Sequence, residues 1–129
     1  RNARYFNVPI TDDWTITGNY WDEQTSLNID QAVANPDGTY TFVISTTDAA
    51  VWNWISTGGL NQGTISIRFQ DIDWSVEDTP TVATRVVPLA ELGTVLPATT
   101  LYVNEAQRAE QIAQRQLGYA RRWAPYPQV

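Results

Sequence analysis

The chain has 129 residues, the length of one domain with a single hydrophobic core. Apolar residues make up 43% and charged residues 17%, which is typical of a globular protein. The sequence contains no Cys, His or Lys. Disulfides, cysteine zinc sites, Ser-His-Asp triads and lysine Schiff bases are therefore excluded within this chain. The residues indicate no cofactor.

The net charge is −6 and the sequence pI is about 4.3. An acidic chain is a poor partner for nucleic acid or for an anionic membrane surface. No apolar run approaches the roughly 20 residues that span a bilayer, so we expect no direct membrane insertion. No signal peptide is visible and the sequence has no Met. We therefore expect a processed chain or a fragment, with a cell-envelope or exported location favoured over a cytoplasmic one.

The first predicted strand covers residues 3–10, where Tyr5, Phe6, Val8 and Ile10 alternate loosely. A short second strand follows at 14–17, before a turn at Gly18. Residues 26–34 and 39–46 are two further predicted strands, rich in β-branched and apolar residues. The segment 35–38, Asn-Pro-Asp-Gly, is a strong turn signal between them, so these two strands are predicted to form a hairpin.

Residues 64–70 alternate between apolar Ile65, Ile67 and Phe69 and polar neighbours, which predicts a strand with one buried face. Residues 81–87 form another predicted strand, ending at Pro88. Residues 89–96 are expected to form a short turn or a single helical turn.

The last element is a predicted helix from residue 105 to residue 123. Asn104 is a favourable N-cap, and Gln107 stands at the N3 position of a capping box. Apolar residues then recur at helical spacing and form a thin stripe, mostly of alanine. Because the stripe buries little area, we expect it to lie against another surface. Its members are Ala106, Ala109, Ile112, Ala113, Leu117 and Ala120.

Together these elements predict a mainly β fold, an antiparallel β-sandwich or jelly roll with one C-terminal amphipathic helix. Residues 1–103 form the predicted sandwich domain, and residues 104–129 form a helix and arm that dock on a partner.

Three segments resemble one bacterial family in their order and spacing. They are residues 25–32, the turn at 35–38, and the block from Asn53 to Gly59 followed by Gly63 and Arg68. Over residues 4–92 the chain is similar to the family catalogued as domain of unknown function 1214. That domain often forms the C-terminal part of longer envelope proteins. The resemblance implies a jelly-roll-like sandwich and no catalytic residues.

Two tryptophans and nearby polar residues form a candidate ligand site. In an extended segment, Trp52 and Trp54 point to one face, where they would stack on a sugar or an apolar ligand. Core packing is the alternative for both. Asn28, Gln31 and Asn53 are polar residues among apolar ones, and either contact the same ligand or bond exposed backbone at sheet edges.

Asp71 and Asp73 are weak candidates for a Ca²⁺ or Mg²⁺ site or for an acid and base pair, and solvated strand-end carboxylates are the simpler interpretation. The glycines in the segment 56–59 either turn the chain or present N–H groups to an anion.

The C-terminal arm combines cations with aromatic rings, which is typical of protein interfaces. Its predicted docking residues are Arg108, Arg115, Tyr119, Arg121, Arg122 and Trp123. The first hypothesis is a non-catalytic binding or structural module of a larger protein or assembly. Its partner would be another protein, a missing domain or a second copy. The alternatives are a carboxylate-dependent hydrolase and a sugar- or lipid-binding module.

Overall fold

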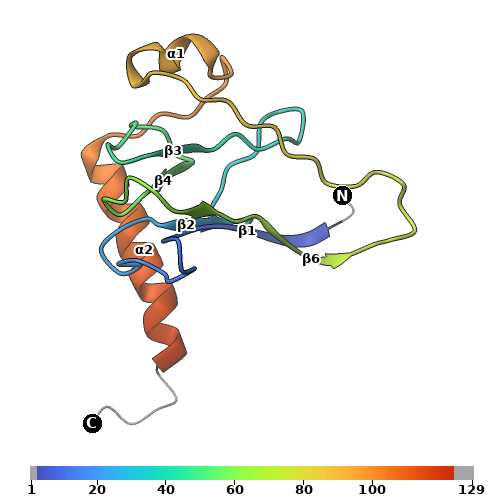
Figure 1. The fold of residues 1–129 in the computed structure, drawn as a ribbon, viewed down its shortest axis with the longest axis horizontal. Helices are drawn as coiled ribbons and strands as arrows, with labels where there is room; N and C mark the ends of the chain where they lie inside the picture. Colours follow the sequence, from blue (N-terminus) through green and yellow to red (C-terminus); the bar gives the residue numbers. More distant parts are fainter. Residues whose placement is uncertain (1–2, 124–129) are drawn as a thin grey trace.

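The computed structural model describes residues 3–123, and the backbone alone for Trp123 (Figure 1). The fold is mixed α/β with a sheet-rich core. Its strands are β1 (Ala3–Thr11), β2 (Ser26–Asn28), β3 (Val43–Ser45), β4 (Trp54–Ser56), β5 (Thr64–Ile65) and β6 (Arg68–Ile72). Its helices are a 3-10 turn, η1 (Leu89–Glu91), then α1 (Leu92–Val95) and α2 (Glu105–Trp123).

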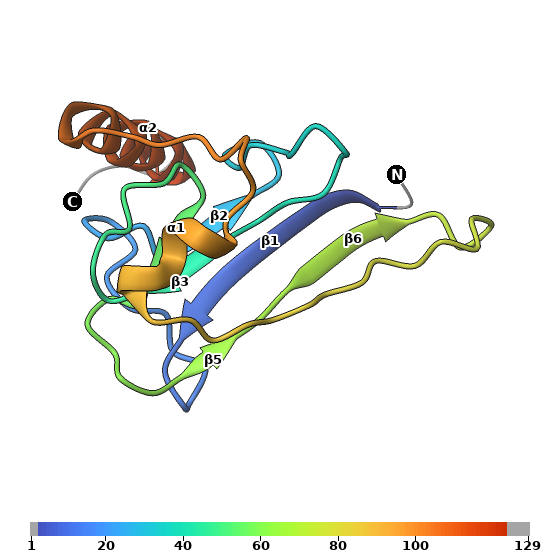
Figure 2. The ribbon, with the colours of Figure 1, turned by 90° about the horizontal axis from the view of Figure 1, so that it is seen from above.

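The larger sheet is built around β1, the longest strand (Figure 2). β2 pairs with one edge of β1, while β5 and β6 pair with the C-terminal and N-terminal halves of its other edge, all antiparallel. β5 and β6 pair with β1 in the same register. They therefore correspond to the one strand predicted at 64–70, with a gap between Ile65 and Arg68. The gap lies opposite Pro9, which has no N–H to donate to the ladder.

β3 and β4 form a second, parallel sheet that packs on the first. Ile55 of β4 and Ile44 of β3 contact the buried face of β1, which carries Phe6, Val8 and Ile10. The alternate residues of these two short strands point the other way. Val43 and Trp54 form a cluster there with Val51, which precedes β4, and Leu92 of α1 and Leu96 just after it pack against this cluster. Both faces of the parallel pair are therefore covered, as parallel sheets require.

The predicted hairpin between 26–34 and 39–46 is wrong, although its turn is correct. Gly38 has a positive φ of 84°, and its N–H bonds the Asn35 carbonyl at 2.9 Å. The first strand ends early because the Asn28 carboxamide oxygen accepts the N–H groups of Asp30 and Gln31, each at 3.0 Å. β2 consequently pairs with β1, and β3 pairs with β4.

Two other predicted strands are absent from the described residues. Residues 14–17 form a turn in which the Asp12 carboxylate accepts the N–H groups of Trp14 and Ile16. Residues 81–87 have no strand partner and are mostly exposed. The short helical segment expected at 89–96 is confirmed as η1 and α1.

The helix α2 begins and ends where the sequence predicts. The Asn104 side chain accepts the Gln107 N–H, and the Gln107 side chain accepts the Asn104 N–H, both at 2.9 Å. The positions of α2 that are buried within the chain are Arg108 and Arg115. Most of the apolar stripe faces solvent, namely Ala106, Ala109, Ala113, Leu117 and Ala120.

Candidate functional site

The N-terminal half of α2 is attached to the smaller sheet through Arg108, whose side chain is buried. Its Nε and Nη2 atoms donate to the two carboxylate oxygens of Asp48, at 2.8 and 3.0 Å. Nη2 also donates to the Val51 carbonyl at 2.6 Å. The guanidinium lies over the Trp54 ring, 5.0 Å from its centroid. One side chain thus orders the segment that leads into β4.

The C-terminal half of α2 is attached to the larger sheet through Arg115. Its Nε donates to the Tyr20 carbonyl and its Nη1 to the Ser26 carbonyl, both at 2.8 Å. Its Nη2 donates to the Ser26 hydroxyl at 2.9 Å. Tyr119 lies beneath, with its ring centroid 5.2 Å from the guanidinium carbon.

These two arginines make contacts within the chain, whereas the sequence analysis assigned them to the docking of a partner. Tyr119 also packs inward, against Tyr20 at a ring distance of 4.7 Å. The Arg122 guanidinium lies 4.9 Å from the Tyr119 centroid, and Arg121 is exposed. The Trp123 side chain lies outside the described part of the chain.

The predicted tryptophan pair does not present two free rings. Trp54 is 6% exposed, and its indole N–H bonds the Ser45 hydroxyl at 2.9 Å. Because Arg108 covers its ring, no sugar can stack there. Trp52 is half-buried and donates its indole N–H to the Gln31 carbonyl at 3.0 Å. Both indoles hold neighbouring segments together.

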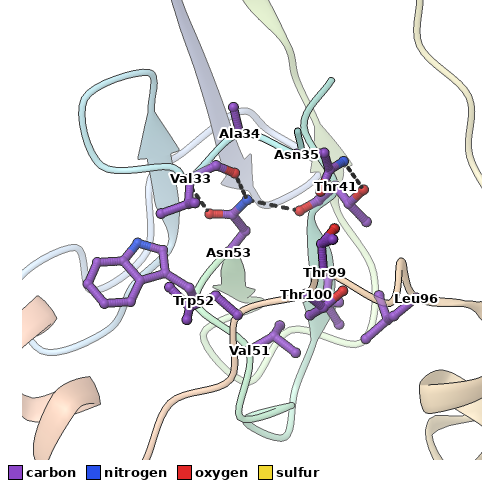
Figure 3. Close-up of a pocket in the computed structure, with 12 residues that line it drawn as sticks. Val33, Ala34, Asn35, Thr41, Val51, Trp52, Asn53, Leu96, Thr99 and Thr100 are labelled. Atoms are coloured by element: carbon purple, nitrogen blue, oxygen red, sulfur yellow. Dashed lines mark hydrogen bonds between the residues drawn. The ribbon is translucent and has the colours of Figure 1, made fainter. Parts of the chain in front are cut away.

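Asn53 joins the loop at 33–41 to β4 (Figure 3). Its amide nitrogen donates to the Val33 and Thr41 carbonyls at 2.7 and 3.1 Å, and its oxygen accepts the Val33 N–H at 2.8 Å. The adjoining cavity measures about 30 Å³. A buried amide with three backbone bonds and so little space beside it serves the fold rather than a ligand.

A larger pocket of about 140 Å³ lies where α2 meets the polar face of the larger sheet. Alternation along β1 places Tyr5 and Asn7 on this face, opposite the buried Phe6 and Val8. The strands and the following turn contribute Tyr5, Asn7, Ser26, Asn28 and Gln31. The helix contributes Arg115, Gly118, Tyr119 and Arg122.

Of the predicted ligand residues, the pocket contains Asn28 and Gln31 but neither tryptophan nor Asn53. Tyr5 and Asn7 were not among the site residues predicted from the sequence. The alternation of polar residues with Phe6 and Val8 in the first strand was the available signal. Arg115 and Arg122 were identified, but as docking residues for a partner.

The pocket holds a buried positive charge. Burial lowers the pKa of the Arg115 guanidinium; the nearby Tyr119 opposes this shift, and Arg122 adds to it by repulsion. Among residues 3–123, no carboxylate lies within ion-pair distance of Arg115. The site therefore has an excess of positive charge and several neutral polar groups.

The paired aspartates lie away from this pocket. Asp71 forms an exposed ion pair with Arg4 at 3.3 Å. The Asp73 carboxylate accepts the Ser75 hydroxyl and N–H at 2.6 and 2.9 Å, and these bonds lower its pKa. Within the described residues, no three acidic side chains gather where they could bind a metal ion. No helix there is long and apolar enough to cross a membrane.

The chain is similar to a protein of known structure. No protein-family model and no curated protein matches the chain, so the resemblance to domain of unknown function 1214 stays a prediction. An uncharacterized protein of known crystal structure from Burkholderia cenocepacia is similar, at 28% identity and a TM-score of 0.61. The match covers 68% of this chain and 23% of that protein, which extends well beyond the similar region.

Proposed function

We propose that this chain is a non-catalytic structural and binding module of a larger protein or assembly. Its role would be to pack the open side of its larger sheet against another segment of a longer polypeptide. One observation carries this proposal: the apolar face of the larger sheet is covered at β1 and at Phe69 of β6, and is left exposed at Ile65 of β5 and at Ile67 between β5 and β6.

The exposed part of that face lies next to the core. Ile65 is paired with Ile10, and alternation places Ile67 on the same face as Ile65 and Phe69. Phe69 packs against the core, whereas Ile65 is 55% and Ile67 is 36% exposed. Burial of these two β-branched side chains would stabilise the protein by about 25 cal/mol for each Å² of apolar surface removed from water.

The edge beside these residues is also unoccupied. β6 pairs only with β1 within the described residues, so its outer N–H and C=O groups have no strand partner. An open edge beside an apolar face is a surface to which another strand can be added. A strand added there would enlarge the sheet toward the sandwich or jelly roll that the sequence predicts, and this architecture forms part of the proposal.

The occupant is proposed to be a segment of the same polypeptide. The similar protein from Burkholderia cenocepacia supports this choice, because the matched region is less than a quarter of its length. A domain inside a longer chain has neighbours at high effective concentration, which favours intramolecular packing over association of copies.

Hydrogen exchange of the β5 and β6 amides that point away from β1 tests the proposal. We expect fast exchange in the 129-residue chain and slower exchange in the full product of its gene. Ile65→Thr together with Ile67→Thr should change the stability of the 129-residue chain little, and should abolish the extra protection in the longer product. Val86→Thr is the matched control, because Val86 is fully exposed outside the sheet.

Three outcomes would contradict this function. The first is that the β5 and β6 amides exchange at equal rates in the two proteins. The second is that the gene product is no longer than this chain. The third is that the protection depends on protein concentration. The last result would assign the face to a second copy.

A further inference from the structure

We propose that the polar pocket between α2 and the larger sheet binds a small hydroxylated molecule through an oxyanion, a carboxylate or a phosphate. The anion would contact Arg122 and the one N–H group of Arg115 that makes no hydrogen bond within the described residues. This site lies on the face of the sheet opposite the exposed isoleucines, so it does not depend on the module role proposed above.

The charges around the pocket favour the binding of an anion. The sequence has fourteen acidic residues and eight arginines, yet none of the nine lining residues is acidic and two are arginines. The register also brings Arg68 of β6 beside Asn7. In this strongly acidic chain, positive charge is thus concentrated at one pocket, and such a concentration of charge attracts anions.

The two buried arginines of α2 differ in their hydrogen-bond partners. Arg108 is 7% exposed and has the Asp48 carboxylate as its partner, whereas Arg115 is 4% exposed and bonds only neutral oxygens. A buried charge without a counter-ion is costly, and most buried charges in proteins are paired. The Arg115 fork has five N–H donors and its hydrogen bonds use four, so one donor remains for a ligand.

The second arginine of the pocket is free to take part. Arg122 lies over the Tyr119 ring and makes no hydrogen bond or ion pair within residues 3–123. Stacking on an aromatic face fixes the plane of a guanidinium while its N–H groups stay available. Arg115 and Arg122 both contact the Tyr119 ring, which brings their charges to one wall of the pocket.

The opposite wall provides neutral hydrogen-bonding groups. The Asn7 amide and the Tyr5 hydroxyl have no partner in the part of the chain that the structure describes, and they adjoin Asn28 and Gln31. Such groups suit hydroxyls rather than hydrocarbon. The volume of about 140 Å³ is well above the roughly 10–15 Å³ that a single water needs, and suits a small molecule rather than a polymer.

Titration followed by NMR of the arginine Nε–H signals tests the inference on the 129-residue chain. The probes are gluconate, inorganic phosphate and glucose at matched ionic strength. We expect saturable shifts of the Arg115 and Arg122 signals with an anion and none with glucose. A response to gluconate alone assigns a carboxylate ligand, and a response to phosphate alone assigns a phosphate. Saturable binding of neither anion would overturn the inference.

Two variants leave the attachment of α2 intact. Arg122→Gln should weaken anion binding about tenfold, the usual effect of losing one hydrogen bond to a charged group. Asn7→Asp should abolish binding, because it places a carboxylate in the pocket at constant size. Arg121→Gln and Asn61→Asp make the same chemical changes on exposed residues outside the pocket. If these controls weaken binding as much as the pocket variants do, the anion is attracted by the surface in general and the site is refuted.

Discussion

Arg108 and Arg115 lie seven residues apart on α2 and donate hydrogen bonds to different layers of the fold. Arg108 bonds the segment before β4, and Arg115 bonds the segment around β2. Seven residues of helix rise about 10.5 Å, close to the roughly 10 Å between two packed sheets. The helix therefore runs along one side of the fold past both sheets, and its two arginines attach it to each of them (Figure 1).

Truncation of Arg108 should destabilise the fold strongly. Arg108→Ala removes two bonds to Asp48, one to the Val51 carbonyl and the contact with Trp54. We expect a loss of about 2–4 kcal/mol in the free energy of unfolding, measured by urea denaturation. Arg121→Ala, on the exposed side of the same helix, should change it by less than about 0.5 kcal/mol. Equal effects of the two variants would show that Arg108 does not join the layers.

Asn53 should tolerate no change of its amide. Asn53→Asp keeps the shape and the acceptor for the Val33 N–H, but turns a carboxylate oxygen toward the Val33 and Thr41 carbonyls. We expect a loss of about 2–3 kcal/mol in unfolding free energy at neutral pH. Asn61→Asp in an exposed loop is the control. If the Asn53→Asp protein is as stable as this control, the loop at 33–41 is held by other contacts.

Gly63 should be required for the approach of its loop to β1. A Cβ at this position would meet the backbone carbonyl of Thr11, which cannot move without disturbing the strand. Gly63→Ala is expected to lower the free energy of unfolding by about 1–3 kcal/mol. Gly93→Ala in α1 meets open space, and should be neutral or stabilise by up to about 1 kcal/mol. Thermal unfolding of the two variants gives the comparison, and a stable Gly63 variant would contradict it.

Asp37 should make the turn at 35–38 sensitive to acid. Its pKa is lowered from 3.8 because the Thr39 hydroxyl and N–H donate to the carboxylate. This contribution to stability is present above pH 3.8 and is lost as the pH falls through the lower folded pKa. Thr39→Val removes the hydroxyl, so the Asp37 pKa should rise toward its ordinary value.

NMR titration of the carboxyl carbons measures this change. Asp73, which is bonded by Ser75 in the same way, serves as an internal reference whose pKa should stay unchanged in Thr39→Val. If the Asp37 pKa is the same in both proteins, the hydroxyl does not cause the shift.

Local signals predicted local structure well in this chain. The capping box at Asn104 and Gln107 placed the start of α2, and the glycine at 38 placed a turn. Both depend on neighbours within four residues. The pairing of strands could not be predicted in this way, because β3 joins β4 in parallel and β2 joins β1. These choices are made by the core around Ile55 and Leu27, which forms only when distant segments meet.

The face of α2 shows the same limit for the site. Periodicity identified the alanine stripe as a face that lies against another surface, but it did not identify the side of the helix that packs on this chain. The buried side is instead chosen by unpaired carbonyls at Tyr20, Ser26 and Val51, which the long arginine side chains can reach. No pattern along the chain reveals which carbonyls lack partners, so the pocket beside Arg115 became visible only with the fold.

The attachment of α2 also has a kinetic consequence. Arg108 bonds a residue that precedes it by 60 positions, and Arg115 bonds residues that precede it by 89 and 95 positions. Contacts so remote in sequence form late, because a long loop must close before they contribute any energy. We therefore expect refolding in which the sheets collapse first and the terminal helix seats afterwards, so that a slow final phase reports on arginine placement rather than on strand pairing.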